Sequence, residues 1–280
     1  MTTTRDTGSP ASANEPQAPK QAQRGFTHFW RNYGLAVLFS VFIIVLWEVV
    51  VRAAHVPEYL FPAPSQIIVA LKEDWSSVLA PAAWVSLREV LIGFVISAVL
   101  GIGLAILLHL FRPLRRALYP LLIGSQTIPI VVLAPILVIL LGYGIMPKLV
   151  IVALICFFPI VVNGIDGLRS VDDEFIRMMK TLDASRWDTF RRVEFPAALP
   201  SIFSGMRIAA TFAAIGAVFG EWSGASQGLG YVMLAATPNL QTARIFAAIL
   251  ILTLIALLLF GIVTLLERTL VPWAPRGGAV

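Results

Sequence analysis

The sequence predicts an all-α membrane protein with six transmembrane helices, and three observations support this. First, 58% of its 280 residues are apolar, which exceeds the roughly 45 to 50% of soluble domains. Second, the apolar residues fall into runs of about the 20 residues that a helix needs to cross a bilayer. Third, one charged segment, residues 166–203, holds seven acidic and six basic side chains and separates the fourth run from the fifth. Such a chain is expected to lie in the cell membrane, in contact with the lipid bilayer.

The first third of the chain is expected to contain a tail and two spans. Residues 1–32 are rich in Ser, Thr, Pro, Ala and Gln, a composition that does not bury a core, so we expect a disordered tail. The first span is predicted at 33–52 and the second, after an outer loop, at 85–110. The second span carries small residues at four-residue spacing that let another helix approach closely: Gly93, Ser97, Gly101 and Ala105.

The third and fourth spans are predicted at 118–141 and 148–164. The third contains a polar patch next to a proline near mid-membrane depth: Ser125, Gln126 and Thr127. Such a patch is costly in lipid unless it faces protein or a wet cavity. Two roles are therefore open, hydrogen bonding between helices and lining a translocation pathway.

The fifth and sixth spans are predicted at 204–222 and 243–266, followed by a short tail at 268–280. Residues 33–267 are thus expected to form one transmembrane domain. The fifth span reaches Glu221 at its end. Two interpretations of this carboxylate are open, a solvated helix end and a contact for a transported solute.

The charged segment 166–203 is predicted to fold in water as a helix, a turn and a second helix. Asp172 and Asp173 suit a helix start, because an aspartate oxygen accepts hydrogen bonds from the unpaired N–H groups of a first turn. This first helix is expected to run to about Leu182, and the helical pattern breaks at Asp183.

The second helix of this segment is predicted to start at Ser185. Ser185 and Asp188 have the spacing of a capping box, and Trp187 and Phe190 are three residues apart, so their side chains share one face. Two prolines that follow are expected to end this helix: Pro196 and Pro200.

The spacing of this segment resembles a signature of the membrane subunits of ABC importers. That signature has Glu-Ala-Ala, three residues, Gly, nine residues and Ile-x-Leu-Pro. The corresponding positions here are Arg177-Met178-Met179, Asp183 and Val193-Glu194-Phe195-Pro196, so the spacing is kept while Glu-Ala-Ala and Gly are replaced. The Ala-Ala-Leu-Pro that follows and the turn at Ala184–Trp187 are similar to the nitrate, sulfonate and taurine branch. The likeness extends from about Phe61 to Trp273.

The resemblance implies a type I ABC importer permease fold with a cytoplasmic coupling helix. It also implies partners: ABC ATPase subunits that consume the ATP, a second permease subunit, expected to be another copy of this chain, and an extracytoplasmic substrate-binding protein. The residues implied to couple the chain to the ATPase are Asp183, Ala184, Ser185, Arg186, Trp187 and Phe190. The alternative is an ordinary amphipathic loop on another protein with several spans.

The positions of Lys and Arg predict the orientation of the chain. In a six-span topology the two termini, the loop at Arg112 and the segment 166–203 share one side, which carries 15 basic residues against 5 on the other side. Basic residues favour the cytoplasmic side of a membrane. Both termini and the segment 166–203 are therefore predicted to be cytoplasmic.

Several functional classes are not expected from this sequence. The chain contains no G-x-x-x-x-G-K-[ST] phosphate loop, so the energy for transport must come from another subunit. Its three histidines are dispersed, and no Ser/His/Asp set converges on one membrane face, so we expect no metal site, no cofactor and no enzyme activity. The net charge of +5 reflects orientation in the membrane rather than affinity for nucleic acid.

Two other membrane classes compete with the ABC permease. A secondary carrier usually shows two related halves and charges near mid-span, neither of which is apparent here. A membrane scaffold would not explain the signature spacing. Within the ABC branch, Gly220-Glu-Trp and Gly228-Leu-Gly-Tyr look most like permeases for pyrimidine precursors of thiamine or for riboflavin-like solutes. Sulfonates such as taurine, or nitrate, are the alternative substrates.

Overall fold

The computed structural model describes residues 24–273, with side chains from Gly34 onward. Over this range it is all-helical, with eleven α-helices and two short π-helical segments. Five helices are long and apolar enough to cross a membrane, and a sixth span results if the bent pair α4 and α5 counts as one. The described residues therefore agree with the predicted six spans.

The long helices are α1 (Arg24–Ala53), α3 (Ala80–Leu110), α6 (Ile145–Arg169), α9 (Phe195–Trp222) and α11 (Thr242–Leu270). The bent pair is α4 (Arg112–Ser125) and α5 (Ile130–Leu141). The remaining α-helices are short: α2 (Pro64–Glu73), α7 (Asp173–Thr181), α8 (Arg186–Thr189) and α10 (Leu229–Ala236). The π-helical segments are Trp75–Leu79 and Phe190–Glu194.

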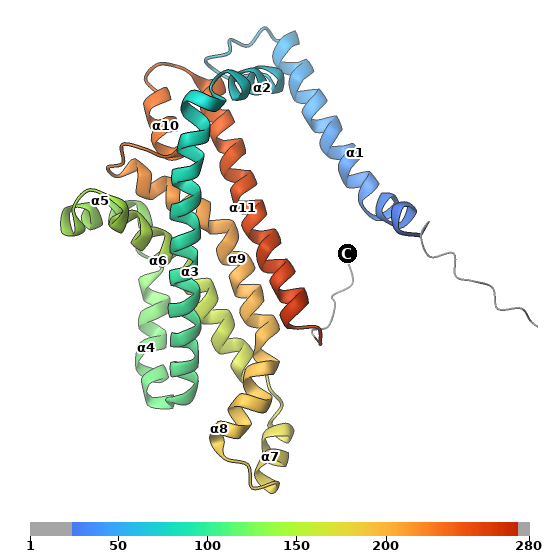
Figure 1. Cartoon of the computed structure of the whole chain (residues 1–280), viewed down its shortest axis with the longest axis vertical. Helices are drawn as coiled ribbons and strands as arrows, with labels where there is room; N and C mark the ends of the chain where they lie inside the picture. The colour runs from blue at the N-terminus through green and yellow to red at the C-terminus, as the bar shows by residue number, and fades with distance from the viewer. Residues whose placement is uncertain (1–23, 274–280) are drawn as a thin grey trace, which may run out of the picture.

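The four helices α3, α6, α9 and α11 form a bundle (Figure 1). Helices α7 and α8 lie at one end of it, here called the α8 end, and α2 and α10 lie at the opposite end, the α10 end (Figure 1). Helix α5 projects to the side and α1 stands apart from the bundle. Only 6% of the apolar stretch of α1 is buried, so lipid or another chain must cover the rest of this helix.

Glycines allow α6 to pack closely against α3 and α9, the two helices that it contacts most. A Cβ atom added at Gly93 of α3 would lie 2.6 Å from the Cβ of Val152 on α6. One added at Gly205 of α9 would lie 2.6 Å from the carbonyl oxygen of Pro159, also on α6. The predicted small-residue stripe of the second span is buried as well, and its contact helix is α6.

The third span differs from the expected single helix. α4 and α5 meet at an angle of 101°, with the break between Ser125 and Ile130. Pro129 is extended there, with φ −62° and ψ 122°. A proline has no N–H to donate and disfavours helical geometry in the residue before it, which accounts for the break at this position.

The prediction that Pro196 and Pro200 end the second loop helix is wrong. Helix α8 continues through the π-helical segment into α9, so that Arg186–Trp222 forms one 37-residue span. Pro196 lies in the first turn of α9, where a missing N–H is tolerated, and Pro200 lies inside the helix. The second span also starts earlier than predicted, at Trp75 rather than at residue 85.

The chain ends were expected to be tails. Helix α1 begins at Arg24, inside the stretch 1–32, and α11 continues to Leu270. The rest of both predicted tails, residues 1–23 and 274–280, lies outside the described residues.

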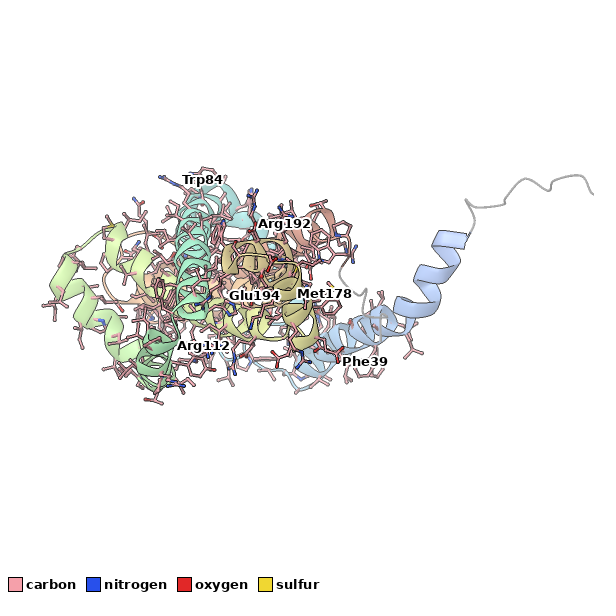
Figure 2. The ribbon with its side chains drawn as sticks, turned by 90° about the horizontal axis from the view of Figure 1, so that it is seen from below. Phe39, Trp84, Arg112, Met178, Arg192 and Glu194 are labelled. Atoms are coloured by element: carbon pink, nitrogen blue, oxygen red, sulfur yellow. The ribbon has the colours of Figure 1, made fainter. Side chains whose placement is uncertain are left out.

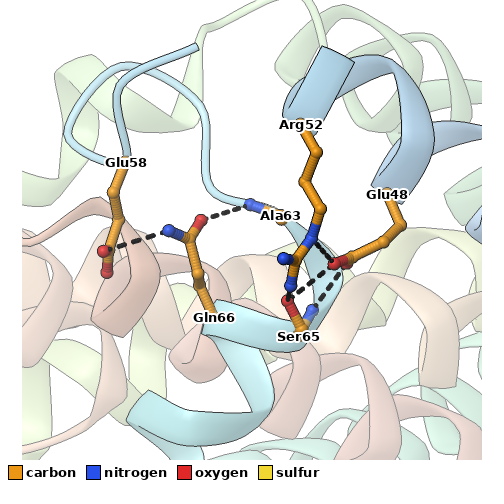
Figure 3. Close-up of polar contacts among 6 residues, drawn as sticks. All are labelled: Glu48, Arg52, Glu58, Ala63, Ser65 and Gln66. Atoms are coloured by element: carbon orange, nitrogen blue, oxygen red, sulfur yellow. Dashed lines mark hydrogen bonds and ion pairs between the residues drawn. The ribbon is translucent and has the colours of Figure 1, made fainter. Parts of the chain in front are cut away.

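A polar cluster joins the end of α1 to the start of α2 (Figure 3). Glu48 accepts hydrogen bonds from the side chain of Arg52 at 2.5 Å and from the hydroxyl of Ser65 at 2.8 Å. The backbone N–H of Ser65 donates to the other Glu48 oxygen at 3.0 Å. This cluster attaches α1 to the α10 end of the molecule.

Candidate coupling site

The turn after α7 has the hydrogen bonds of a Schellman motif. The backbone N–H of Ala184 donates to the carbonyl of Met179, and that of Asp183 donates to the carbonyl of Lys180, both at 3.1 Å. This pattern places a left-handed residue just past the helix end, a position that favours glycine. Asp183 occupies it with φ 52°. The turn predicted at Asp183 is therefore confirmed.

Both predicted helix caps of this segment are also present. The carboxylate of Asp172 accepts a backbone hydrogen bond from the first turn of α7 at 2.9 Å. The hydroxyl of Ser185 accepts one from the backbone N–H of Asp188 at 3.1 Å and donates to the Asp188 carboxylate. These bonds satisfy N–H groups that would otherwise be unpaired at the two helix starts.

The aromatic pair after the second cap has one exposed and one buried member. Trp187 is 59% exposed, whereas Phe190 is 5% exposed. Their rings stack with centroids 5.3 Å apart. Phe190 belongs to a buried cluster with Leu168 and Ile202, so the exposed indole rests on a ring that is fixed in the core.

Two polar contacts attach this segment to the end of α3. The guanidinium of Arg186 donates to the carbonyl oxygen of Leu110 at 2.8 Å. The Nε2 atom of His109 lies 2.9 Å from a carboxylate oxygen of Glu194, and both side chains are mostly buried. The segment is therefore attached to the end of α3 as well as being continuous with α9.

Sequence reasoning missed the role of His109 and Glu194, which are 85 residues apart. The available signal was His109, a polar side chain in the last turn of the second span, close to a charged loop. Seen from the α8 end, Glu194 and Arg192 lie over the bundle (Figure 2). The segment thus covers the ends of the helices that it contacts.

The predicted polar patch lies on the surface at the break between α4 and α5. Ser125, Gln126 and Thr127 are all exposed on the isolated chain. The hydroxyls of Ser125 and Thr127 donate to carbonyls of their own helix turn, at 2.7 and 2.8 Å. These hydroxyls therefore do not bond to another helix of this chain, and both a contact with a partner helix and a position along a pathway stay predictions.

Glu221 is not at a solvated helix end, because it is fully buried. Its carboxylate accepts hydrogen bonds from the hydroxyl of Ser86 at 2.5 Å and from the backbone N–H of Gly230. Near Glu221, the amine of Lys148 forms an ion pair with a carboxylate oxygen of Glu89 at 2.7 Å. This buried network joins α3, α6, α9 and α10 at the α10 end, and it is separate from the polar patch of Ser125.

Comparison of the sequence with known protein families identifies the family of this chain. Residues 97–272, more than half of the chain, match the family described as the binding-protein-dependent transport system inner membrane component. The chain belongs to this family. It is the permease subunit of an ABC importer, and the resemblance indicated by the signature spacing is confirmed.

Relatives of this permease are similar over most of their length. The formylaminopyrimidine transport permease protein ThiX of Halalkalibacterium halodurans is 39% identical over 85% of this chain and 95% of the relative. The riboflavin transport system permease protein RibX of Chloroflexus aurantiacus is 34% identical over 87% and 91%. The taurine transport system permease protein TauC of Escherichia coli is 28% identical over 87% and 90%.

A solved structure shows the same fold. A chain of the MetNI methionine ABC transporter in an inward-facing conformation matches with a TM-score of 0.54 and 20% identity, over 68% of this permease and 97% of that chain. The fold is that of a type I importer permease, embedded in the membrane by several spans. The family description implies a binding protein as partner, and an ABC importer requires ATPase subunits.

Proposed function

We propose that this permease imports a small heterocyclic solute as one of two identical subunits, and that the residues from Asp183 to Phe190 dock its ATPase on the cytoplasmic side. The observation that carries the docking proposal is the exposed Trp187 on a fixed frame. The frame consists of the Ser185 cap, the stacked Phe190 ring and the bond from Arg186 to α3. Aromatic anchors of this kind often dominate the binding energy of an interface.

Charge supports the cytoplasmic position of this segment. The side of the chain that includes it carries 15 basic residues against 5 on the other side. Basic residues concentrate in the cytoplasmic loops of membrane proteins. The ATPase, which consumes cytoplasmic ATP, is accessible only on that side.

Exposed apolar helices support pairing with a second copy. Ile139 and Leu140 of α5, which projects from the bundle, are 82% and 72% exposed. One chain offers one coupling helix and six spans, and closed two-fold symmetry is the commonest way for a subunit to pair. A translocation pathway between two copies would also receive the exposed patch of Ser125, Gln126 and Thr127 from both.

The docking proposal is tested by truncating one exposed tryptophan at each end of the bundle. Trp187→Ala should reduce copurification of the ATPase, because loss of an aromatic anchor typically costs about 2 kcal/mol or more. Trp84→Ala is the matched control, since Trp84 is 61% exposed, close to the 59% of Trp187, but belongs to the start of α3, which lies at the α10 end (Figure 1). If both variants retain the ATPase while Trp187→Ala lowers thermal stability, Trp187 serves only its own chain.

The substrate proposal is supported by the relatives. Those named for formylaminopyrimidine and riboflavin are 39% and 34% identical to this chain, whereas the one named for taurine is 28% identical. Uptake of labelled formylaminopyrimidine, riboflavin and taurine into vesicles would separate the two classes. Uptake of taurine or another sulfonate alone would establish the alternative substrate.

ATP-independent uptake by the chain alone would identify a secondary carrier.

A further inference from the structure

Arginines gather around a hollow at the α8 end, next to the turn between α3 and α4. The hollow has a volume of about 230 Å³ and lies between the first turns of α4 and the end of α6. Its lining consists of Arg115, Arg116, Tyr119, Pro120, Ile165 and Arg169. In the view from this end, Arg112 of α4 lies beside the segment that carries Arg192 and Glu194, not under it (Figure 2).

These arginines lack acidic partners. Within residues 24–273, no carboxylate forms an ion pair with Arg115, Arg116 or Arg169. The positive charges of Arg112, Arg116 and Arg169 all act on Arg115, so the groups are close enough to repel one another. By contrast, Arg207 of α9 pairs with Glu267 of α11. The cluster therefore keeps an excess of positive charge that an anion would neutralise.

The side chains suit a phosphate group in particular. A guanidinium presents several N–H donors in a planar fork that matches phosphate oxygens. Arg115, Arg116 and Arg169 line the hollow from two helices, and Tyr119 is a further lining residue. An anion held here would contact both α4 and α6 and so fix their spacing.

The surroundings indicate that the phosphate belongs to a lipid. The hollow follows directly on the end of the α3 span at Leu110, where a membrane surface would lie. An apolar hollow of about 400 Å³ flanks the first turn of α4, lined by Leu107, Phe111, Pro113 and Leu114. A basic pocket between two helices at the end of a span is the pattern expected for an anionic lipid headgroup, and the apolar hollow at the start of α4 offers a surface for acyl chains.

We propose that the arginine hollow between α4 and α6 binds the phosphate headgroup of an anionic phospholipid. The inference rests on the proposed cytoplasmic position of the α8 end, but it requires neither ATPase docking at Trp187 nor a particular solute. A binding assay in detergent does not depend on membrane orientation. Its failure would therefore leave the proposed function untouched.

The test measures lipid binding to the detergent-purified complex of permease and ATPase by native mass spectrometry, with phosphatidylglycerol and phosphatidylcholine as probes. Arg115→Gln/Arg169→Gln should weaken phosphatidylglycerol binding about 30-fold, since each basic residue near a lipid surface contributes about 1 kcal/mol. Arg177→Gln/Lys180→Gln is the matched control, because it removes the same charge from exposed positions on α7 at the same end. This control should bind as the unaltered chain does.

Four outcomes would overturn the proposal. Equal weakening in both double variants would show unspecific attraction between charges. Equal binding of the two lipids would show that the net negative charge of the headgroup is not recognised, because phosphatidylcholine carries a phosphate as well but is neutral overall. Displacement of phosphatidylglycerol by millimolar inorganic phosphate would identify a site for a soluble anion. Loss of the ATPase from Arg115→Gln/Arg169→Gln, with lipid binding unchanged, would assign the cluster to the partner protein.

Discussion

Asp183 adopts a backbone conformation that most residues avoid. Its φ of 52° belongs to the left-handed region, and the Schellman bonds on either side hold it there. Glycine enters this region freely and aspartate tolerates it, whereas other L-residues cost about 1 to 2 kcal/mol. Aspartate is therefore a permitted residue at the position where the importer signature has glycine.

We predict that Asp183→Gly keeps transport and that Asp183→Val uncouples it. Valine is β-branched and has no local hydrogen-bonding group, so it should distort the turn that positions α8, although the complex still assembles. Uptake and ATP hydrolysis in reconstituted vesicles measure the effect. Equal coupling in the two variants would show that the left-handed turn is not required.

The buried pair of Glu89 and Lys148 allows a test of the network at the α10 end. Glu89 is 1% and Lys148 is 8% exposed, and removal of one member of such a pair leaves a buried charge that typically costs about 3 to 5 kcal/mol. Lys148→Met should therefore lower the thermal stability of the purified permease strongly. Lys148→Met/Glu89→Leu should recover most of the loss. A double variant as unstable as the single one would place the cost in packing rather than in charge.

At the scale of elements, α8 is connected to two spans at once. It continues into α9 as one helical segment, and Arg186 and Glu194 attach the segment to the end of α3. Helix α6 is held against both spans by close contacts at glycines. A push on α8 should therefore move α3, α6 and α9 together.

We predict that Arg186→Ala reduces solute uptake per ATP hydrolysed in those complexes that still contain the ATPase. The lost bond joins a charged guanidinium to the Leu110 carbonyl, and such bonds contribute about 1.5 to 3 kcal/mol. Its loss should therefore shift the equilibrium between attached and detached positions of α8 about tenfold or more. Arg191→Ala serves as control, because Arg191 is exposed on the same segment. If both variants show the same ratio of uptake to hydrolysis, the contact with α3 does not transmit motion.

The sequence predicted the local features of these elements because each depends on residues a few positions apart. The caps at Asp172 and Ser185 and the turn at Asp183 are of this kind. The contacts of His109 with Glu194 and of Ser86 with Glu221 join residues 85 and 135 positions apart, so they require the tertiary arrangement.

Prolines were the main source of error in the predicted boundaries. Pro129 breaks a predicted span, whereas Pro196 and Pro200 are accommodated within a continuous one. Pro200 lies inside α9, where its missing N–H leaves one helical hydrogen bond unmade, so a proline by itself does not determine where a helix ends. Composition alone did not reveal which of these positions each proline would occupy.

At the scale of the whole molecule, the two ends of the bundle should face opposite sides of the membrane. Single cysteines at Ser77 and Ser226, both exposed, should react with an impermeant reagent added from outside, in a Cys156→Ser background. A cysteine at Ser185 should react only after the membrane is permeabilised. Strong labelling of Ser185 in intact cells would reverse the topology.

The central claim is that the exposed face of α8 touches an ATPase partner. The most direct measurement is crosslinking from a cysteine at Arg191, which is exposed one helical turn after Trp187 and leaves that tryptophan in place, in the assembled complex and the Cys156→Ser background. A cysteine at Trp84 is the control at the other end. The account predicts a crosslink to the ATPase from position 191 and none from position 84. A crosslink from position 84 alone, in a complex that is assembled and active, would contradict it.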